Sequence, residues 1–265
     1  MTDHAQHQTM GHPSPWPWIV ILATLGLLYA IGLVRQPQSK HWNPWRTLRW
    51  YAGLLVAGAA LIGPLPVAAQ TSFVAHMTGH LLLGMLAPIL LVLGAPITLG
   101  LRALPVARSR RCVRLLSQPA FALVAHPVTA AVLNMGGLAV LYTTDLYRIM
   151  HEHALVHVVV HAHVLLAGYL FTAAMIGLDP VIHRPSYLYR AVVLVLAMGV
   201  HSILAKSLYA YPPAGVPGDQ AQAGSMLMYY GGDAVDLVLI VIFCAQWFRA
   251  TRPPPRIVPA ALPSG

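Results

Sequence analysis

Charged residues are scarce in this 265-residue chain. They make up 9% of it, whereas hydrophobic residues make up 57%. A soluble domain of this size carries about 25% charged residues, so the composition excludes an ordinary soluble protein and predicts an integral membrane protein. Long apolar runs without strand-like alternation favour an all-α bundle over a membrane β-barrel.

Cysteine is almost absent. The two thiols, Cys112 and Cys244, lie far apart in the sequence, so they provide neither a disulfide framework nor a CxxC metal site. A transition metal would therefore have to bind histidine, methionine, aspartate or backbone groups.

Seven hydrophobic segments predict a single domain of seven transmembrane helices at 17–250. An outer tail with histidine and methionine is expected at 1–16, and a proline-rich cytoplasmic tail at 251–265. The seven segments cover residues 17–34, 48–68, 73–100, 122–143, 154–177, 188–209 and 226–248.

Proline and glycine predict two interruptions of the helices. Pro88, Gly94 and Pro96 are expected to kink or end the helix that begins at 73. The link at 210–225, which is rich in proline and glycine, is expected to be an ordered loop.

Basic residues alternate from one link to the next. Fourteen of the 16 arginines and lysines fall on one side, and only Arg148 and Lys206 fall on the other. Since basic links stay on the cytoplasmic side, this pattern predicts an outside N-terminus and a cytoplasmic C-terminus. The net charge of +9 is then explained by membrane orientation, and no nucleic-acid partner is expected.

Five histidines lie between His151 and His163, directly before an apolar run. At about 100° per residue, His153, His157 and His161 share one helical face, whereas the other two point elsewhere. These three cover about 12 Å of helix rise, so one metal ion would need ligands from other helices. The stretch is predicted to form one wall of a shared pocket.

Polar residues of other segments are expected at the same outer depth. Ionisable side chains are costly in the apolar layer, so they usually face inward and serve a function. The residues predicted to bind metal are His76, Met77, His80, His153, His157, His161, His201, Asp233 and Asp236. Asn134 is expected near mid-depth and Met85 just below the histidines. The alternative is that the aspartates only neutralise a histidine or Lys206 between helices.

These donor types are compatible with copper, zinc or haem as the bound group. Histidine and thioether without thiolate suit copper, zinc would accept three histidines and an aspartate, and histidines on facing helices could ligate haem. Further soft-metal ligands occur in the N-terminal tail, which could capture copper or could be a disordered polar tail. They are His4, His7, Met10 and His12.

Four motifs resemble the seven-span CtaG-like cytochrome c oxidase assembly proteins, and the resemblance covers nearly the whole chain. They are HMxxH at 76–80, the histidine-rich stretch before Gly168, His201 with Ser202, and the run from Asp219 and Gln220 through Gly224 and Met228 to Gly231, Gly232 and Asp233. The chain departs from the family at Tyr229 and Tyr230, where a tryptophan is expected, and at Asp233, where many relatives carry glutamate.

The resemblance implies a non-catalytic factor of the bacterial inner membrane that assembles haem–copper oxidases by supplying copper on the outer side. Its expected partners are oxidase subunits and the lipid bilayer. Two alternatives stay open. One is a zinc-dependent intramembrane hydrolase, for which His201, Ser202 and Asp233 supply the residue types. The other is a haem-binding or quinone-linked redox protein.

Overall fold

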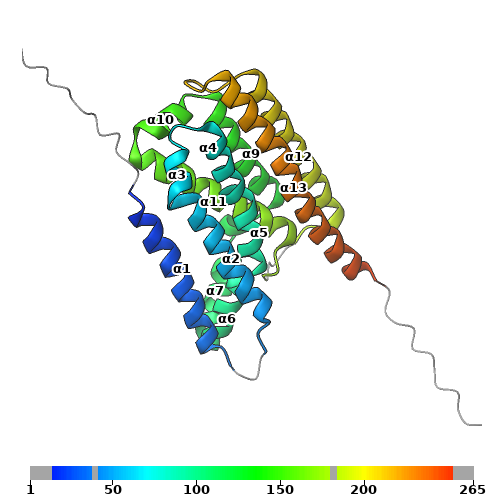
Figure 1. Ribbon diagram of the computed structural model, residues 1–265. Helices are drawn as coiled ribbons and strands as arrows, with labels where there is room; N and C mark the ends of the chain where they lie inside the picture. Colours follow the sequence, from blue (N-terminus) through cyan, green and yellow to red (C-terminus); the bar gives the residue numbers. More distant parts are fainter. Residues whose placement is uncertain (1–13, 38–40, 180–183, 253–265) are drawn as a thin grey trace, which may run out of the picture.

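The computed structural model describes residues 14–37, 41–179 and 184–252, and in these ranges the regular structure is helical (Figure 1). The predicted ligands of the N-terminal tail, and the predicted C-terminal tail from 253 onward, lie outside the described residues. The elements are α1 (Trp16–Arg35), α2 (Pro44–Leu61), α3 (Pro64–Ala68), α4 (Phe73–Leu81), the π-helical turn η1 (Leu82–Leu86), α5 (Ala87–Leu93), α6 (Pro96–Ala103), α7 (Val106–Leu116), α8 (Pro119–Val124), α9 (Pro127–Thr143), α10 (Leu146–Glu152), α11 (Ala154–Ile176), α12 (Tyr187–Ala210) and α13 (Gly218–Thr251).

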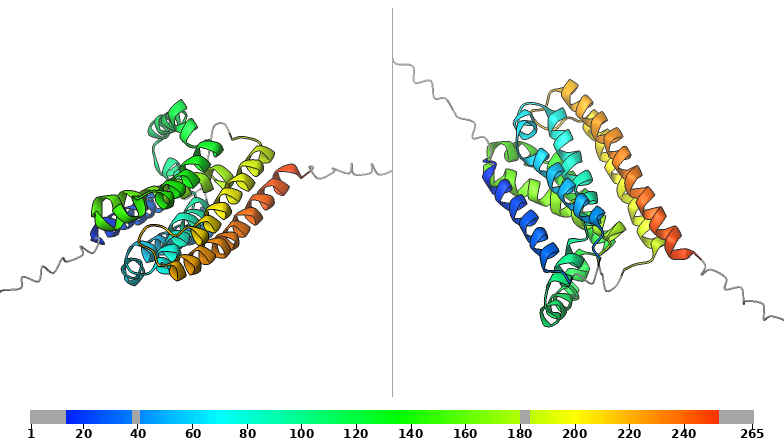
Figure 2. Two further views of the ribbon diagram at one scale, coloured as in Figure 1. Left: turned by 90° about the horizontal axis from the view of Figure 1, so that it is seen from above. Right: turned by 60° about the horizontal axis from the view of Figure 1, so that its bottom comes forward.

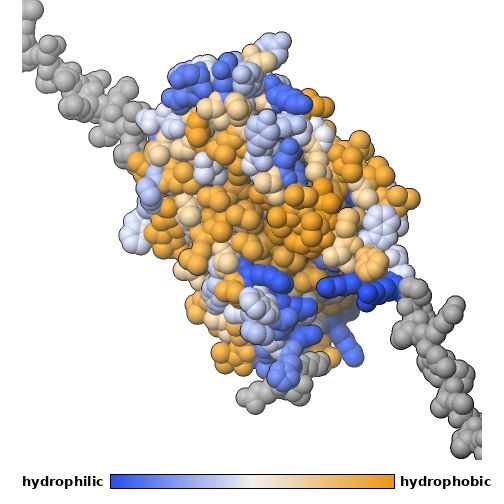
Figure 3. All heavy atoms as spheres, turned by 45° about the vertical axis from the view of Figure 1, so that its right-hand side comes forward, coloured by the Kyte–Doolittle hydropathy of each residue, from blue (hydrophilic) through white to orange (hydrophobic). Residues whose placement is uncertain are grey.

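Six helical stretches of the described chain are long and apolar enough to cross a membrane, or up to seven if α9 and α10 count as one bent span. α9 has 17 residues, about 26 Å of rise, and α10 turns away from it by 79°. Figure 3 shows a broad hydrophobic belt with hydrophilic atoms gathered at both ends of the molecule. The predicted all-α, multi-pass membrane fold is confirmed.

The two ends of the bundle differ in shape. α10 and α3 lie at one end, here called the α10 end, and α6 and α7 lie at the other (Figure 1). Figure 2 shows the pair α7 and α8 projecting from the rest of the bundle. The histidines discussed below lie between the α10 end and the middle of the bundle.

The helix predicted to begin at 73 is interrupted as its prolines and glycine suggested. α5 ends at Leu93, and Ala95 adopts φ 50° before Pro96 opens α6. Pro88 stands in the first turn of α5, directly after η1. Proline has no N–H for the carbonyl four residues earlier and its ring would collide with that carbonyl, which accounts for the wider π turn. This turn starts one residue after α4 ends.

The predicted loop at 210–225 is wrong in its second half, because α13 already begins at Gly218. Pro217 precedes that first turn, and Asp219 within it places a negative charge at the helix N-terminus, where it is stabilising. Gln220 then accepts a hydrogen bond of 3.0 Å from the backbone N–H of Phe73. This bond ties the start of α13 to the start of α4.

The histidine-rich stretch is not one helix. α10 ends at Glu152 and α11 begins at Ala154, with His153 between them at φ −126° and ψ 114°. The prediction that His153 continues the face of His157 and His161 is therefore wrong. His153 is exposed at the α10 end, and its carbonyl oxygen accepts from the N–H of His157 at 3.0 Å.

Candidate metal centre

The histidines predicted to share one pocket divide between two small cavities. The central cavity, of about 30 Å³, is bordered by residues that include His80, Met85, Asn134, Thr172, His201 and Asp236. The end cavity, of about 20 Å³, lies nearer the α10 end and is bordered by residues that include Gln70, His76, Met150, His151, His157 and His161. The expectation of a single pocket at one depth is thus corrected to two sites.

His80 and His201 are the two imidazoles of the central cavity. His80 comes from the last turn of α4 and His201 from α12, and their ring centroids lie 6.2 Å apart with planes inclined by 26°. Both side chains are buried, and Nε2 of each ring has no hydrogen-bond partner. Buried polar atoms are normally bonded to protein or water, so each of these two nitrogens is available to a water molecule or to a ligand.

Glycines let both rings pack directly on backbone. A Cβ atom added at Gly84 in η1 would lie 3.3 Å from Cε1 of His80. One added at Gly232 in α13 would lie only 2.5 Å from Cε1 of His201. The next turn of the same helix thus packs against His80, and the neighbouring α13 packs against His201, while neither Nε2 has a protein hydrogen bond.

The other donors of the central cavity come from different helices. Asp236 of α13 is 6% exposed, and the half-buried Met85 belongs to η1. Asn134 of α9 also borders the cavity. Two imidazoles with a thioether form a set that suits Cu(I), and a carboxylate can balance its charge.

The number of ligating side chains and the size of the cavity bear on which metal the central cavity could hold. Within the described ranges, no three His, Cys, Asp or Glu side chains lie close enough together to hold one ion. Zinc sites take at least three protein ligands, whereas the imidazoles that border the central cavity are two, His80 and His201. Cu(I) accepts low coordination numbers and thioether sulfur. A cavity of about 30 Å³ has room for an ion or a water molecule.

Hydrogen bonds to backbone carbonyls, rather than contacts with glycine, orient two of the four imidazole rings of the end cavity. Nδ1 of His151 lies 2.8 Å from the carbonyl oxygen of Tyr147, and Nδ1 of His161 lies 2.8 Å from that of His157. Because a carbonyl oxygen only accepts, each of these Nδ1 atoms donates, which leaves the lone pair on Nε2. A histidine that binds metal is commonly held in this way.

The remaining two rings of the end cavity are held differently. Nε2 of His76 lies 3.0 Å from the hydroxyl oxygen of Tyr142. The ring of His157 stacks on that of His161 with centroids 4.0 Å apart, and its Nδ1 is buried without a partner. Two of the four imidazoles therefore keep a lone pair on Nε2, and a third has a free Nδ1.

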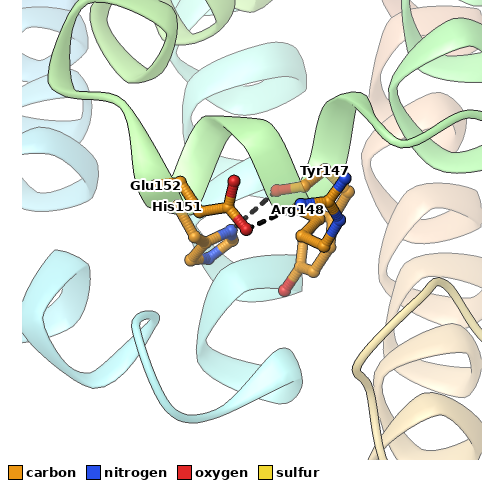
Figure 4. A network of polar contacts seen from close by, with 4 residues as sticks. All are labelled: Tyr147, Arg148, His151 and Glu152. Atoms are coloured by element: carbon orange, nitrogen blue, oxygen red, sulfur yellow. Dashed lines mark hydrogen bonds and ion pairs between the residues drawn. The ribbon is translucent and has the colours of Figure 1, made fainter.

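Sequence reasoning missed His151, because the break at His153 was not visible in the pattern. Figure 4 shows His151 and Tyr147 extending from the same side of α10, next to the ion pair between Arg148 and Glu152. That ion pair, 2.8 Å long, lies on the surface. The ring of Tyr147 contacts His76 with centroids 5.0 Å apart, so α10 closes over the end of α4.

Three predicted ligands border neither cavity. Met77 is fully buried in an apolar cluster with Phe73 and Met228, and its sulfur accepts from the hydroxyl of Tyr142 at 3.8 Å. His153 and Asp233 are exposed. The predicted alternative, an aspartate paired with a histidine or with Lys206, is not seen either, since the one ion pair among the described residues joins Arg148 and Glu152.

Comparison with known proteins identifies relatives along most of the chain. A family model described as cytochrome c oxidase caa3 assembly factor (Caa3_CtaG) matches residues 27–250. Uncharacterized proteins of Mycobacterium leprae, Mycobacterium bovis and Mycobacterium tuberculosis are each 29% identical to this chain, over 85%, 73% and 73% of it respectively. The chain spans 38% of the length of the first relative and 31% of the other two. No solved structure matches.

Proposed function

We propose, from the premise that this chain belongs to the family of cytochrome c oxidase caa3 assembly factors, that it binds Cu(I) in the central cavity and delivers it to the oxidase. The copper is cargo rather than a resident cofactor. The protein would act in the bacterial inner membrane, with its N-terminus and its α10 end outside and its C-terminus in the cytoplasm.

The observation that carries this proposal is the pair of buried Nε2 atoms on His80 and His201. Each unsatisfied buried polar group costs about 1–3 kcal/mol, and an ion held between the two rings would remove both penalties. Met85 adds a thioether, and Asp236 supplies a negative charge at the same cavity. Since imidazole and thioether together favour Cu(I), copper fits this donor set better than zinc does.

The end cavity supplies a route to this site. His76 and His80 lie one turn apart on α4, so the two cavities are neighbours along the helix. Nε2 of His151 and of His161 can bind an ion that comes from the α10 end. Copper would then pass from these half-buried imidazoles to the enclosed pair.

The experiment that tests the proposal combines metal binding with oxidase assembly. The protein is purified without oxygen and titrated with Cu(I) against a chelator. The His80→Ala, His201→Ala double variant is then compared with His153→Ala, an exposed histidine outside both cavities. Each form is also expressed in a host that lacks its own assembly factor, and oxidase activity is measured in the membranes.

The expected result is that the original chain and His153→Ala bind one equivalent of Cu(I) and restore oxidase activity, whereas the double variant does neither. The proposal is wrong if the purified protein binds no Cu(I). It is also wrong if the double variant supports full oxidase assembly.

A further inference from the structure

Asp233 places a carboxylate on the outer surface of the helical bundle, in a helix that is long and apolar enough to cross a membrane. It follows Gly232, which packs against His201, so Asp233 lies at the level of the central cavity. His201 precedes the end of α12 at Ala210 by nine residues, or about 14 Å of rise. Within the described ranges, Asp233 is exposed and forms neither an ion pair nor a hydrogen bond.

Lipid alone is a poor neighbour for this carboxylate. Lysine and arginine can extend their long side chains to the membrane surface, but the short aspartate side chain cannot. Ionisable residues at this depth are costly, and they normally face protein or a water-filled cavity. The position of Asp233 therefore calls for a protein surface that covers it.

A stripe of exposed residues along α13 has the spacing of a helix-packing seam. Asp233 is preceded on this face by Met226 and Tyr230, which are 49% and 65% exposed, and followed by Leu237 and Val241, which are 60% and 59% exposed. The separations of four, three, four and four residues place all five on one side of the helix. A second helix could pack along the whole stripe.

Polar groups beside the stripe also lack partners. A groove of about 330 Å³ between α12 and α13 is bordered by Lys206, Ser225 and Tyr230 among others. The hydroxyl of Ser225 is buried in this region without a hydrogen-bond partner. The ammonium group of Lys206 lies 5.1 Å from the ring of Tyr229. Figure 3 shows pale and blue atoms interrupting the hydrophobic belt on the side that α12 and α13 form.

We propose that a transmembrane helix of the oxidase docks along this stripe and receives copper there; the inference rests on the proposed function. The partner helix carries a cationic or hydrogen-bond-donating side chain opposite Asp233. Gly232 has no side chain, packs against the ring of His201 and directly precedes Asp233. Copper would leave the central cavity beside it, laterally and within the membrane.

Site-specific photocrosslinking in intact membranes tests the docking surface. A photoreactive phenylalanine analogue replaces Tyr230 or Leu237 in the full chain, which is expressed together with the oxidase. The control position is Leu27, which is 62% exposed. It belongs to α1, a helix on the opposite side of the bundle from α13 (Figure 1). Crosslinked products are identified by mass spectrometry as oxidase subunit, second copy of the chain, or lipid.

The expected result is crosslinking of Tyr230 and Leu237 to a membrane subunit of the oxidase, several-fold above the yield from Leu27. Asp233→Leu lowers that yield several-fold, and Asp233→Glu restores it. Leucine suits a lipid-facing site, so the first variant should still fold. Cu(I) titration of Asp233→Leu should give the original stoichiometry, since Asp233 does not border the central cavity.

The docking inference is overturned if the stripe crosslinks only to lipid or only to a second copy of the chain, or if Asp233→Leu leaves the yield unchanged. A different result would contradict the proposed function while leaving the docking inference intact. If the protein binds no Cu(I) but crosslinks to the oxidase persist, the docking surface stands and the copper transfer is refuted.

Discussion

The central cavity and the end cavity orient their imidazoles by different means. In the central cavity, His80 and His201 are held by contact with glycine backbone, and their buried Nε2 atoms have no partner. In the end cavity, His151 and His161 are held by backbone carbonyls. Contact with glycine leaves a buried pair of donors without protein hydrogen bonds at Nε2, whereas the carbonyl bonds fix a tautomer on rings that remain partly accessible. The first arrangement suits retention of an ion and the second suits its uptake.

The largest expected effect is a loss of Cu(I) affinity that occurs for variants of the central cavity but not for a variant of the end cavity. His80→Ala or His201→Ala should lower Cu(I) affinity by about 100-fold or more, because losing a direct ligand costs at least as much as losing a group that only orients one. His76→Ala, at the end cavity, should leave the equilibrium affinity unchanged. Competition with a Cu(I) chelator measures all three, and equal losses would erase the distinction between the sites.

The next substitution disturbs the packing of the central cavity without removing a metal-binding side chain. In Gly232→Ala, the new methyl group would displace the ring of His201, and such overpacking costs about 1–3 kcal/mol of stability. Cu(I) affinity should fall as well. Gly137→Ala is the matched control, since its Cβ would collide with the ring of His163 outside both cavities.

Thermal unfolding and Cu(I) titration of these two glycine variants separate packing from binding. Both should lose stability, and only Gly232→Ala should lose affinity. A Gly137→Ala protein that also binds copper poorly would indicate a general packing defect.

A smaller effect is expected on the rate of uptake. His161→Ala removes one accessible Nε2 from the end cavity and should slow Cu(I) loading by about tenfold, with little change in the final occupancy. Stopped-flow loading followed by chelator competition provides both quantities. Unchanged loading rates would remove the end cavity from the proposed route.

The smallest predicted change is a loss of protein stability when a hydrogen bond beside the end cavity is removed. Tyr142→Phe removes the hydroxyl that bonds Nε2 of His76 and should cost about 1 kcal/mol in the free energy of unfolding. Cu(I) affinity should not change, because Tyr142 does not border the central cavity. Denaturation monitored by circular dichroism would detect the loss, and a strong fall in affinity would contradict it.

The sequence predicted much of the fold because apolar composition determines membrane-spanning helices almost alone. The interruption near Gly94 and Pro96 was also predictable, since proline and glycine restrict the backbone directly. The break at His153 was not. No proline or glycine stands there, and the turn depends on α10 folding over α4 through the contact of Tyr147 with His76.

The candidate site was predicted in its residue types but not in its grouping. Helix rise placed His80, His201, Asn134 and Met85 near one another, as the structure has them. Helical periodicity cannot say which face of α13 meets α12. Asp233 was therefore expected inside, although only Asp236 is buried and borders the central cavity. The close contact at Gly232, which orients His201, depends on tertiary packing.

X-ray absorption at the copper edge of the Cu(I)-loaded protein tests the central claim most directly. Scattering from two imidazoles is expected in the original chain. That signal should fall in His80→Ala and in His201→Ala, and it should persist in a variant that carries both His151→Ala and His161→Ala. A spectrum that is unchanged in the first two variants and lost in the third would contradict the assignment of copper to the central cavity.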